Sequence, residues 1–188
     1  PPRYQRATEV ARKESENLMT TPSFLELGVS AGVVDALRER DIVAPFPIQA
    51  MVMEDALAGR DVLAKSKTGS GKTLGFAIPI VERLTSADAK PSAVVLVPTR
   101  ELAQQVSDDV EAIAEARGLG VGVAYGGVSI DQQAKKVARA QLIIATPGRL
   151  EDLAERKLVR LDKVKILVLD EADRMLDMGF QPQVDRIV

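Results

Sequence analysis

Ser66-Lys67-Thr68-Gly69-Ser70-Gly71-Lys72-Thr73 lies between a short apolar run, 61–65, and a helical pattern over 71–84. Its two glycines allow main-chain N–H groups to turn inward around a phosphate, and the start of a helix adds partial positive charge. The stretch therefore predicts a phosphate-binding loop between a strand and a helix. In such a loop Lys72 would contact the β- and γ-phosphates, and the Thr73 hydroxyl would bind Mg²⁺.

The strict form of this loop has glycine at the position that Ser66 occupies. The alternative interpretation is a glycine-rich turn with surface lysines. The order strand, Gly-Lys-Thr, helix favours the phosphate loop.

The acidic pair Asp170-Glu171, which follows the apolar run 166–169, is the predicted second half of the phosphate-binding site. Carboxylates at the carboxyl end of a parallel strand face the ligand crevice. We therefore expect Asp170 to hold Mg²⁺ through water and Glu171 to orient and deprotonate an attacking water. The alternative is that the two acids only favour the start of the following helix.

Apolar runs alternate with helical patterns along the rest of the chain. The continuous apolar runs are typical of strands that are covered on both faces. Repeated alternation predicts an α/β fold, a doubly wound and mostly parallel sheet with helices on both faces. The expected strands are 61–65, 93–97, 121–125, 141–145 and 165–169, and the expected helices are 30–40, 47–57, 71–84, 100–116, 130–139 and 147–156.

Composition narrows the chemistry of these 188 residues, which include no cysteine, histidine or tryptophan. Disulfides, thiolate nucleophiles, imidazole bases and the usual zinc sites are excluded. The 25 basic and 27 acidic residues argue against a polycation that binds by bulk charge. Because no signal-peptide pattern and no membrane-length apolar run is present, we expect a cytoplasmic protein without a membrane partner.

Asp170-Glu171-Ala172-Asp173 spells D-E-A-D, and together with the phosphate loop it resembles the N-terminal RecA-like domain of DEAD-box RNA helicases. Three further segments follow in the family's order: Pro98-Thr99-Arg100-Glu101-Leu102-Ala103, Gly126-Gly127 and Thr146-Pro147-Gly148-Arg149. The resemblance runs from about Phe24 to Phe180. It implies a RecA-like P-loop domain, ATP and Mg²⁺ as cofactors, and ATP hydrolysis coupled to local unwinding of an RNA duplex.

The resemblance also implies a set of site residues. Lys72, Asp170 and Glu171 would be catalytic, Thr73 and Asp170 would hold the metal, and Asp173 would couple the two domains of the complete protein. The implied nucleotide-binding residues of the loop are Thr68, Gly69, Ser70, Gly71, Lys72 and Thr73. The implied contacts with the RNA backbone, independent of sequence, are Pro98, Thr99, Arg100, Gly127, Thr146, Gly148 and Arg149. As an alternative, Thr99 or Thr146 could simply cap the helix that follows it.

Pro45-Phe46-Pro47-Ile48-Gln49 resembles the Q motif of the same family, in which the glutamine contacts adenine. The resemblance adds Phe24, Ile42 and Gln49 to the nucleotide site. Ile42 stands where the family has a stacking aromatic, and Phe46 replaces a usual threonine. We therefore expect Gln49 to select adenine while Ile42 gives weaker stacking. The alternative is that Gln49 is an ordinary amide on a helix surface.

We expect three parts: an N-terminal extension, 1–23, that is helical or mobile; a first RecA-like domain, 24–188, incomplete at its C-terminal end; and a second RecA-like domain, absent here, as its partner. The isolated chain is expected to be monomeric and nearly inactive. Two other functions stay open, a DNA helicase or translocase and a non-catalytic, ATP-gated RNA clamp.

Overall fold

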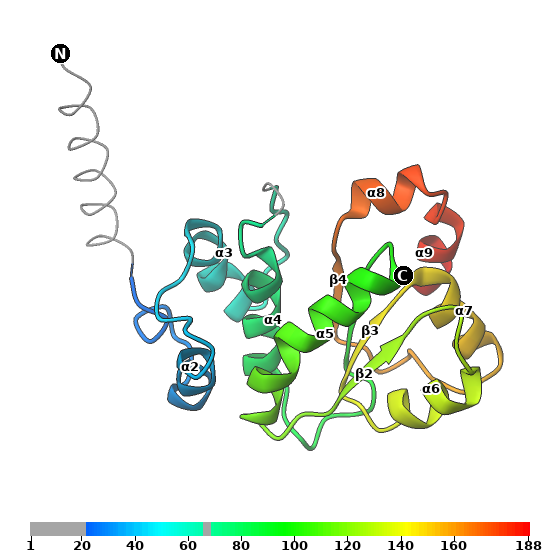
Figure 1. The fold of residues 1–188 in the computed structure, drawn as a ribbon, viewed down its shortest axis with the longest axis horizontal. Coiled ribbons are helices and arrows are strands. Elements are labelled where there is room, and N and C mark those ends of the chain that lie inside the picture. Colours follow the sequence, from blue (N-terminus) through cyan, green and yellow to red (C-terminus); the bar gives the residue numbers. More distant parts are fainter. Residues whose placement is uncertain (1–21, 66–68) are drawn as a thin grey trace, which may run out of the picture.

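Four parallel strands form the sheet of the computed structural model, which describes residues 22–65 and 69–188 (Figure 1). The strand order is β2-β3-β1-β4. Leu96 at the end of β1 lies opposite Ala145 of β3 and Leu169 of β4, so the carboxyl ends of these strands share one edge. The strands are β1 (Ala93–Leu96), β2 (Val121–Ala124), β3 (Leu142–Ala145) and β4 (Ile166–Leu169).

Helices cover both faces of the sheet, which confirms the doubly wound α/β prediction (Figure 1). Ala93 and Val95 of β1 face a buried cluster that includes α2, α4 and α5. Val94 and Leu96 face a second cluster that includes α6 and α7. The helices are α2 (Ala31–Arg38), α3 (Pro47–Leu57), α4 (Lys72–Arg83), α5 (Arg100–Glu115), α6 (Ile130–Val137), α7 (Pro147–Glu155), α8 (Ala172–Asp177) and α9 (Gln181–Ile187).

The predicted strand at 61–65 is wrong. These residues follow α3, are exposed and contain no strand, and Leu63 is 102% exposed. An apolar run becomes a strand only when its main chain pairs with a neighbour. In the described part of the chain β4 pairs with β1 alone, so β4 is an edge strand with Leu167 and Leu169 exposed.

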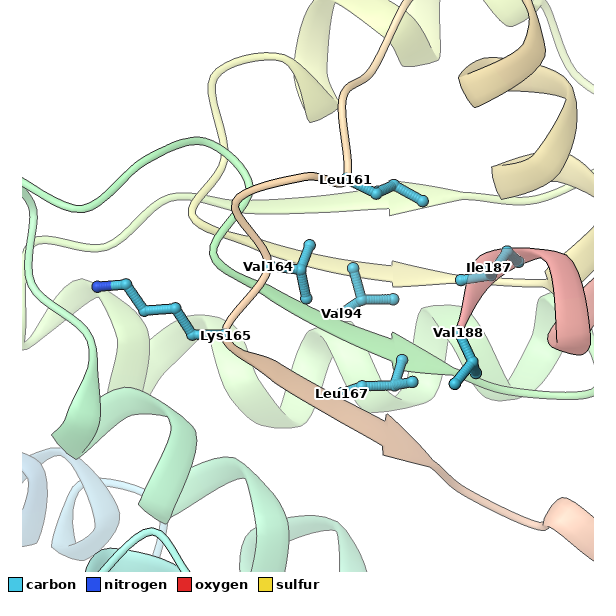
Figure 2. Close-up of a pocket in the computed structure, with 7 residues that line it drawn as sticks. All are labelled: Val94, Leu161, Val164, Lys165, Leu167, Ile187 and Val188. Atoms are coloured by element: carbon cyan, nitrogen blue, oxygen red, sulfur yellow. The ribbon is translucent and has the colours of Figure 1, made fainter.

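An apolar hollow lies beside β4, on the sheet face that α7 and α9 cover (Figure 2). Its walls include Val94, Val164, Leu167 and Ile187, and it holds no predicted site residue. The predicted extension lies outside the described residues, except for Pro22 and Ser23. Among the helices that the structure describes, none has the length and apolarity to cross a membrane.

Candidate functional site

The loop before α4 has the backbone conformation that the sequence predicts. Gly69 and Gly71 have φ of +79° and +81°, the left-handed region in which glycine carries no side-chain penalty. Gly71 precedes the first residue of α4, so Lys72 and Thr73 lie in the first helical turn. The main-chain N–H groups at this helix start are suited to an anion. Thr68 lies outside the described residues.

Ser70 supplies a test of whether the loop fits a phosphate. Its Oγ is buried, and it has no hydrogen-bond partner among the residues that the structure describes. Buried hydroxyls are normally hydrogen-bonded, so an orphaned one calls for an explanation. A phosphate oxygen held at the start of α4 would supply the missing partner, and the residues present therefore fit a phosphate group.

Gln49 joins the adenine-site segment to the phosphate loop. Its Oε1 accepts a hydrogen bond from the Phe46 main-chain N at 2.9 Å, and its Nε2 donates to the Gly71 carbonyl oxygen at 2.8 Å. The side chain is 1% exposed, so the alternative of a surface amide is wrong. An amide can make two further hydrogen bonds, one at each end, and these are the groups that adenine would use. The adenine contact itself stays a prediction.

The other two expected adenine-site residues lie closer to the core. Phe24 is 1% exposed and belongs to the cluster beneath α2, α4 and α5. Ile42 is half-buried against the same cluster. Their contact with a nucleotide stays a prediction.

Asp170 lies at the carboxyl end of β4, where the sequence predicts it. Its main-chain N donates to the Leu96 carbonyl oxygen of β1 at 3.0 Å. Burial raises the pKa of the Asp170 carboxyl, the Lys72 charge opposes this rise, and Glu171 adds to it. The Lys72 charge therefore acts on Asp170, which brings together the phosphate loop and the acidic pair.

Glu171 occupies an unusual backbone position, with φ of +52°. A non-glycine residue in this region is strained, and such residues concentrate at functional sites. Its carboxylate accepts a hydrogen bond from Arg174 Nη1 at 3.1 Å. Glu171 precedes α8 directly, but its side chain makes no capping hydrogen bond, so capping does not explain it.

The donor set also fits Mg²⁺. The described residues hold no group of three or more acidic side chains that could bind a metal ion by themselves. Mg²⁺ commonly uses one or two protein ligands, with phosphate oxygens and waters completing its octahedron. Thr73 and Asp170 are ligands of that kind.

The predicted RNA-contacting residues lie at the carboxyl ends of the strands and the starts of the helices that follow. Thr99 Oγ1 accepts from the Leu102 main-chain N at 3.2 Å, so Thr99 does cap α5. Thr146 precedes α7 and its side chain makes no such bond. Pro98 is buried, Gly148 is half-buried in the first turn of α7, and Asp173 is exposed in the first turn of α8.

Two residues that sequence reasoning missed bring three of the predicted segments together. The Arg100 guanidinium lies over the Tyr125 ring, 5.6 Å from its centroid. Gln133 on α6 accepts hydrogen bonds from Tyr125 N and from Arg149 Nη1. Gln133 shares the inner face of α6 with Val137, one turn further along, so a glutamine at an apolar helix position was the available signal.

The sequence matches a family model described as DEAD/DEAH box helicase over residues 46–188. It is 44% identical over 181 residues to DEAD-box ATP-dependent RNA helicase 52A of Oryza sativa subsp. japonica, covering 85% of this chain and 30% of that protein. It is 43% identical over 183 residues to ATP-dependent rRNA helicase RRP3 of Yarrowia lipolytica, covering 96% and 38%. The chain spans about a third of the length of these relatives.

Solved structures share the fold. A DEAD box protein from the hyperthermophile Methanococcus jannaschii superposes with a TM-score of 0.83 at 38% identity, covering 88% of this chain and 46% of that one. The RNA helicase Prp28 from Chaetomium thermophilum, bound to ADP, gives a TM-score of 0.81 at 35% identity, covering 89% and 43%.

Proposed function

The chain belongs to the DEAD/DEAH box helicase family, and we propose that it is the nucleotide- and RNA-binding half of an ATP-dependent RNA helicase. The observation that carries this proposal is the loop before α4, where Gly69 and Gly71 have left-handed φ and the buried Ser70 Oγ has no hydrogen-bond partner among the described residues. The relatives named as ATP-dependent RNA helicases, and the ADP bound to Prp28, support the same function.

The ATP site is proposed to act through residues of α4 and β4. Lys72 would neutralise the β- and γ-phosphates, and the main-chain N–H groups after Gly69 would hold their oxygens. Thr73 and Asp170 would hold Mg²⁺, Asp170 through water, and the bound ion would offset charge on the phosphates. Glu171 would orient the attacking water and accept its proton.

The RNA site is proposed to lie around Arg100, Gly127 and Arg149, with the other predicted contact residues beside them. Arginine forks match the geometry of phosphate oxygens, and contacts to phosphate and sugar carry no base sequence. We therefore infer binding that does not depend on RNA sequence. In the complete protein, a second RecA-like domain would close on the first when ATP binds and bend one strand out of a short duplex.

Glu171→Gln in the complete protein tests this function. The variant keeps the shape of the side chain but cannot accept a proton, so RNA-stimulated ATP hydrolysis should fall by roughly 100-fold or more while ATP binding persists. Glu115→Gln, an exposed position at the end of α5, is the matched control. Full ATPase activity in Glu171→Gln would refute the assignment.

The same assay separates the other two functions. Stimulation by DNA equal to that by RNA would indicate a DNA helicase or translocase, and ATP-dependent RNA binding without hydrolysis would indicate a clamp. We also infer that the 188-residue chain alone hydrolyses ATP negligibly, because an arginine finger from a second domain contributes roughly 10³–10⁵ in rate. RNA-stimulated turnover by the purified chain would contradict that.

A further inference from the structure

Gln133 is a buried polar residue that the proposed chemistry does not use. It lies on α6 with 7% of its surface exposed, between two segments predicted to contact RNA. Its Oε1 accepts from the Tyr125 main-chain N at 3.3 Å and from Arg149 Nη1 at 2.5 Å. A glutamine oxygen has two lone pairs, so these two donors use its full capacity.

Each of the two donors is connected to a predicted RNA contact. Tyr125 follows β2 and carries Arg100 over its ring. Arg149 also donates from Nη2 to the Val128 carbonyl oxygen at 3.1 Å, which holds the chain just after Gly127. One amide oxygen therefore connects the starts of α5 and α7 with the glycine turn between β2 and α6.

The chemistry of Gln133 suits an anchor for a cation that must also bind a phosphate. A guanidinium has five N–H donors, and the contacts with Gln133 and Val128 use only two. A neutral amide holds Arg149 and leaves its positive charge available for a phosphate. A carboxylate at the same place would cancel that charge. Fixing the side chain beforehand also removes ordering entropy that RNA binding would otherwise lose.

We propose that Gln133 is a positioning residue that holds Arg149 and the Tyr125–Arg100 pair in the arrangement that contacts the RNA backbone. The proposal rests on the proposed function, because it assumes that Arg100 and Arg149 bind phosphates. Gln133 itself need not touch RNA.

The test compares Gln133→Met with Gln132→Met in the complete protein. Methionine keeps the length of the side chain and removes the acceptor, and Gln132 is the exposed neighbour on the same helix. We would measure the affinity for a labelled ten-nucleotide poly-uridine RNA, with a non-hydrolysable ATP analogue, at several salt concentrations. Gln133→Met should bind about tenfold more weakly, whereas Gln132→Met should bind as the wild type does.

The salt dependence separates positioning from a general loss of stability. For a single strand, losing one phosphate contact reduces the slope of log affinity against log salt by about 0.7. Arg149→Ala should show this reduction, and so should Gln133→Met. Protein that is partly unfolded would bind less RNA with an unchanged slope. Adding Gln133→Met to Arg149→Ala should reduce affinity less than Gln133→Met does in the wild type, because the Arg149 contact is already lost and only the Tyr125–Arg100 part remains.

Gln133→Glu gives a second test if Gln133→Met does not fold. Glutamate keeps an acceptor oxygen for both donors, so its thermal midpoint should stay close to that of the wild type. Its charge should neutralise Arg149 and reduce the salt slope. If the folded Gln133 variants bind RNA with wild-type affinity and salt slope while Arg149→Ala binds more weakly, the proposed role of Gln133 is wrong and the proposed RNA site stands. Wild-type binding by both Arg100→Ala and Arg149→Ala would overturn the proposed RNA site.

Discussion

Gln49 Nε2 donates a hydrogen bond to the carbonyl oxygen of Gly71 at 2.8 Å, across the start of α3 and the start of α4. The other end of the same amide accepts from the main-chain N of Phe46. Gln49, the residue expected to select adenine, therefore also joins the start of α3 to the phosphate loop through these two hydrogen bonds. We call this pair of hydrogen bonds the tie. Its replacement should therefore change both the stability of the fold and the recognition of the base.

Gln49→Ala should lower the free energy of unfolding by about 1–3 kcal/mol, because it leaves a main-chain N–H and a carbonyl oxygen without their buried partner. Urea titration of the 188-residue chain measures this loss. The matched control is Gln132→Ala, an exposed glutamine on α6, for which we expect a change within about 0.5 kcal/mol. Equal losses in the two variants would contradict the tie.

Base selection gives a separate prediction for Gln49. The wild-type chain should bind ADP more tightly than GDP, since the second hydrogen and second lone pair of the Gln49 amide remain for adenine. Gln49→Ala should reduce the difference. Calorimetric titration with the two nucleotides measures it, and equal affinities in the wild type would show that Gln49 does not select the base.

The two loop glycines differ in surroundings, although both have positive φ. Gly69→Ala should lower the free energy of unfolding by about 1–2 kcal/mol, the penalty for a left-handed residue with a Cβ. Gly71→Ala should lose about 1 kcal/mol more, because its Cβ would lie 2.5 Å from Gln49 Nε2 and from Phe46 Cδ2 and would break the tie. At Gly69 a Cβ would meet no atom within 4 Å among the described residues.

Urea titration of both glycine variants in the wild-type and Gln49→Ala backgrounds checks the reason for the difference. If the Gly71 penalty comes from Gln49, the gap between the two alanine variants should shrink once that side chain is gone. A gap of the same size in both backgrounds would assign the penalty to another cause.

Four of the five expected strands form, and the two at the centre of the sheet, β1 and β3, are buried on both faces. Runs such as 93–97 and 142–145 are almost entirely buried, so burial and pattern agree. The run 61–65 has three apolar residues between Asp61 and Lys65 and pairs with no strand in the described part of the chain, and pairing with another segment is a property that no local pattern contains.

In the site, too, some features follow from local sequence patterns and others depend on how distant segments pack. The positions of Lys72 and Asp170 follow from local rules, a glycine loop before a helix and a carboxylate after a parallel strand. The bond from Arg149 to Gln133 joins residues on α6 and α7, and the Gln49–Gly71 bond joins α3 to the loop before α4. These links depend on how helices pack, so the sequence indicates only that a polar residue lies on an apolar face.

Asp170 should make the fold less stable as the pH rises. A carboxyl with a raised pKa binds its proton more tightly in the folded chain than in the unfolded one, so stability falls as the pH rises from the ordinary value of 3.8 through the raised folded value. Asp170→Asn removes the buried charge. It should be more stable than the wild type near neutral pH, and this advantage should disappear as the pH is lowered below 3.8.

Urea midpoints across this pH range measure the effect. Asp173→Asn removes an equal charge from an exposed position three residues away and controls for the change in net charge. A stability difference between Asp170→Asn and the wild type that does not vary with pH would contradict the role of burial.

Thr99 and Thr146 hold equivalent positions before α5 and α7, but only Thr99 caps its helix with the side chain. Thr99→Ala should therefore lower the free energy of unfolding by about 1 kcal/mol, because the Leu102 N–H loses its acceptor. Thr146→Ala removes no capping bond and should lower it less. Thr99→Ser keeps an oxygen that can accept the same bond, so it should recover most of the loss in a urea titration.

RNA affinity separates capping from RNA contact at these two threonines. If both threonines contact the RNA backbone, both alanine variants should bind RNA more weakly although only Thr99→Ala is markedly less stable. Equal stability losses at the two positions would show that the capping bond at Thr99 contributes nothing, and unchanged RNA affinity in Thr146→Ala would remove Thr146 from the proposed RNA site.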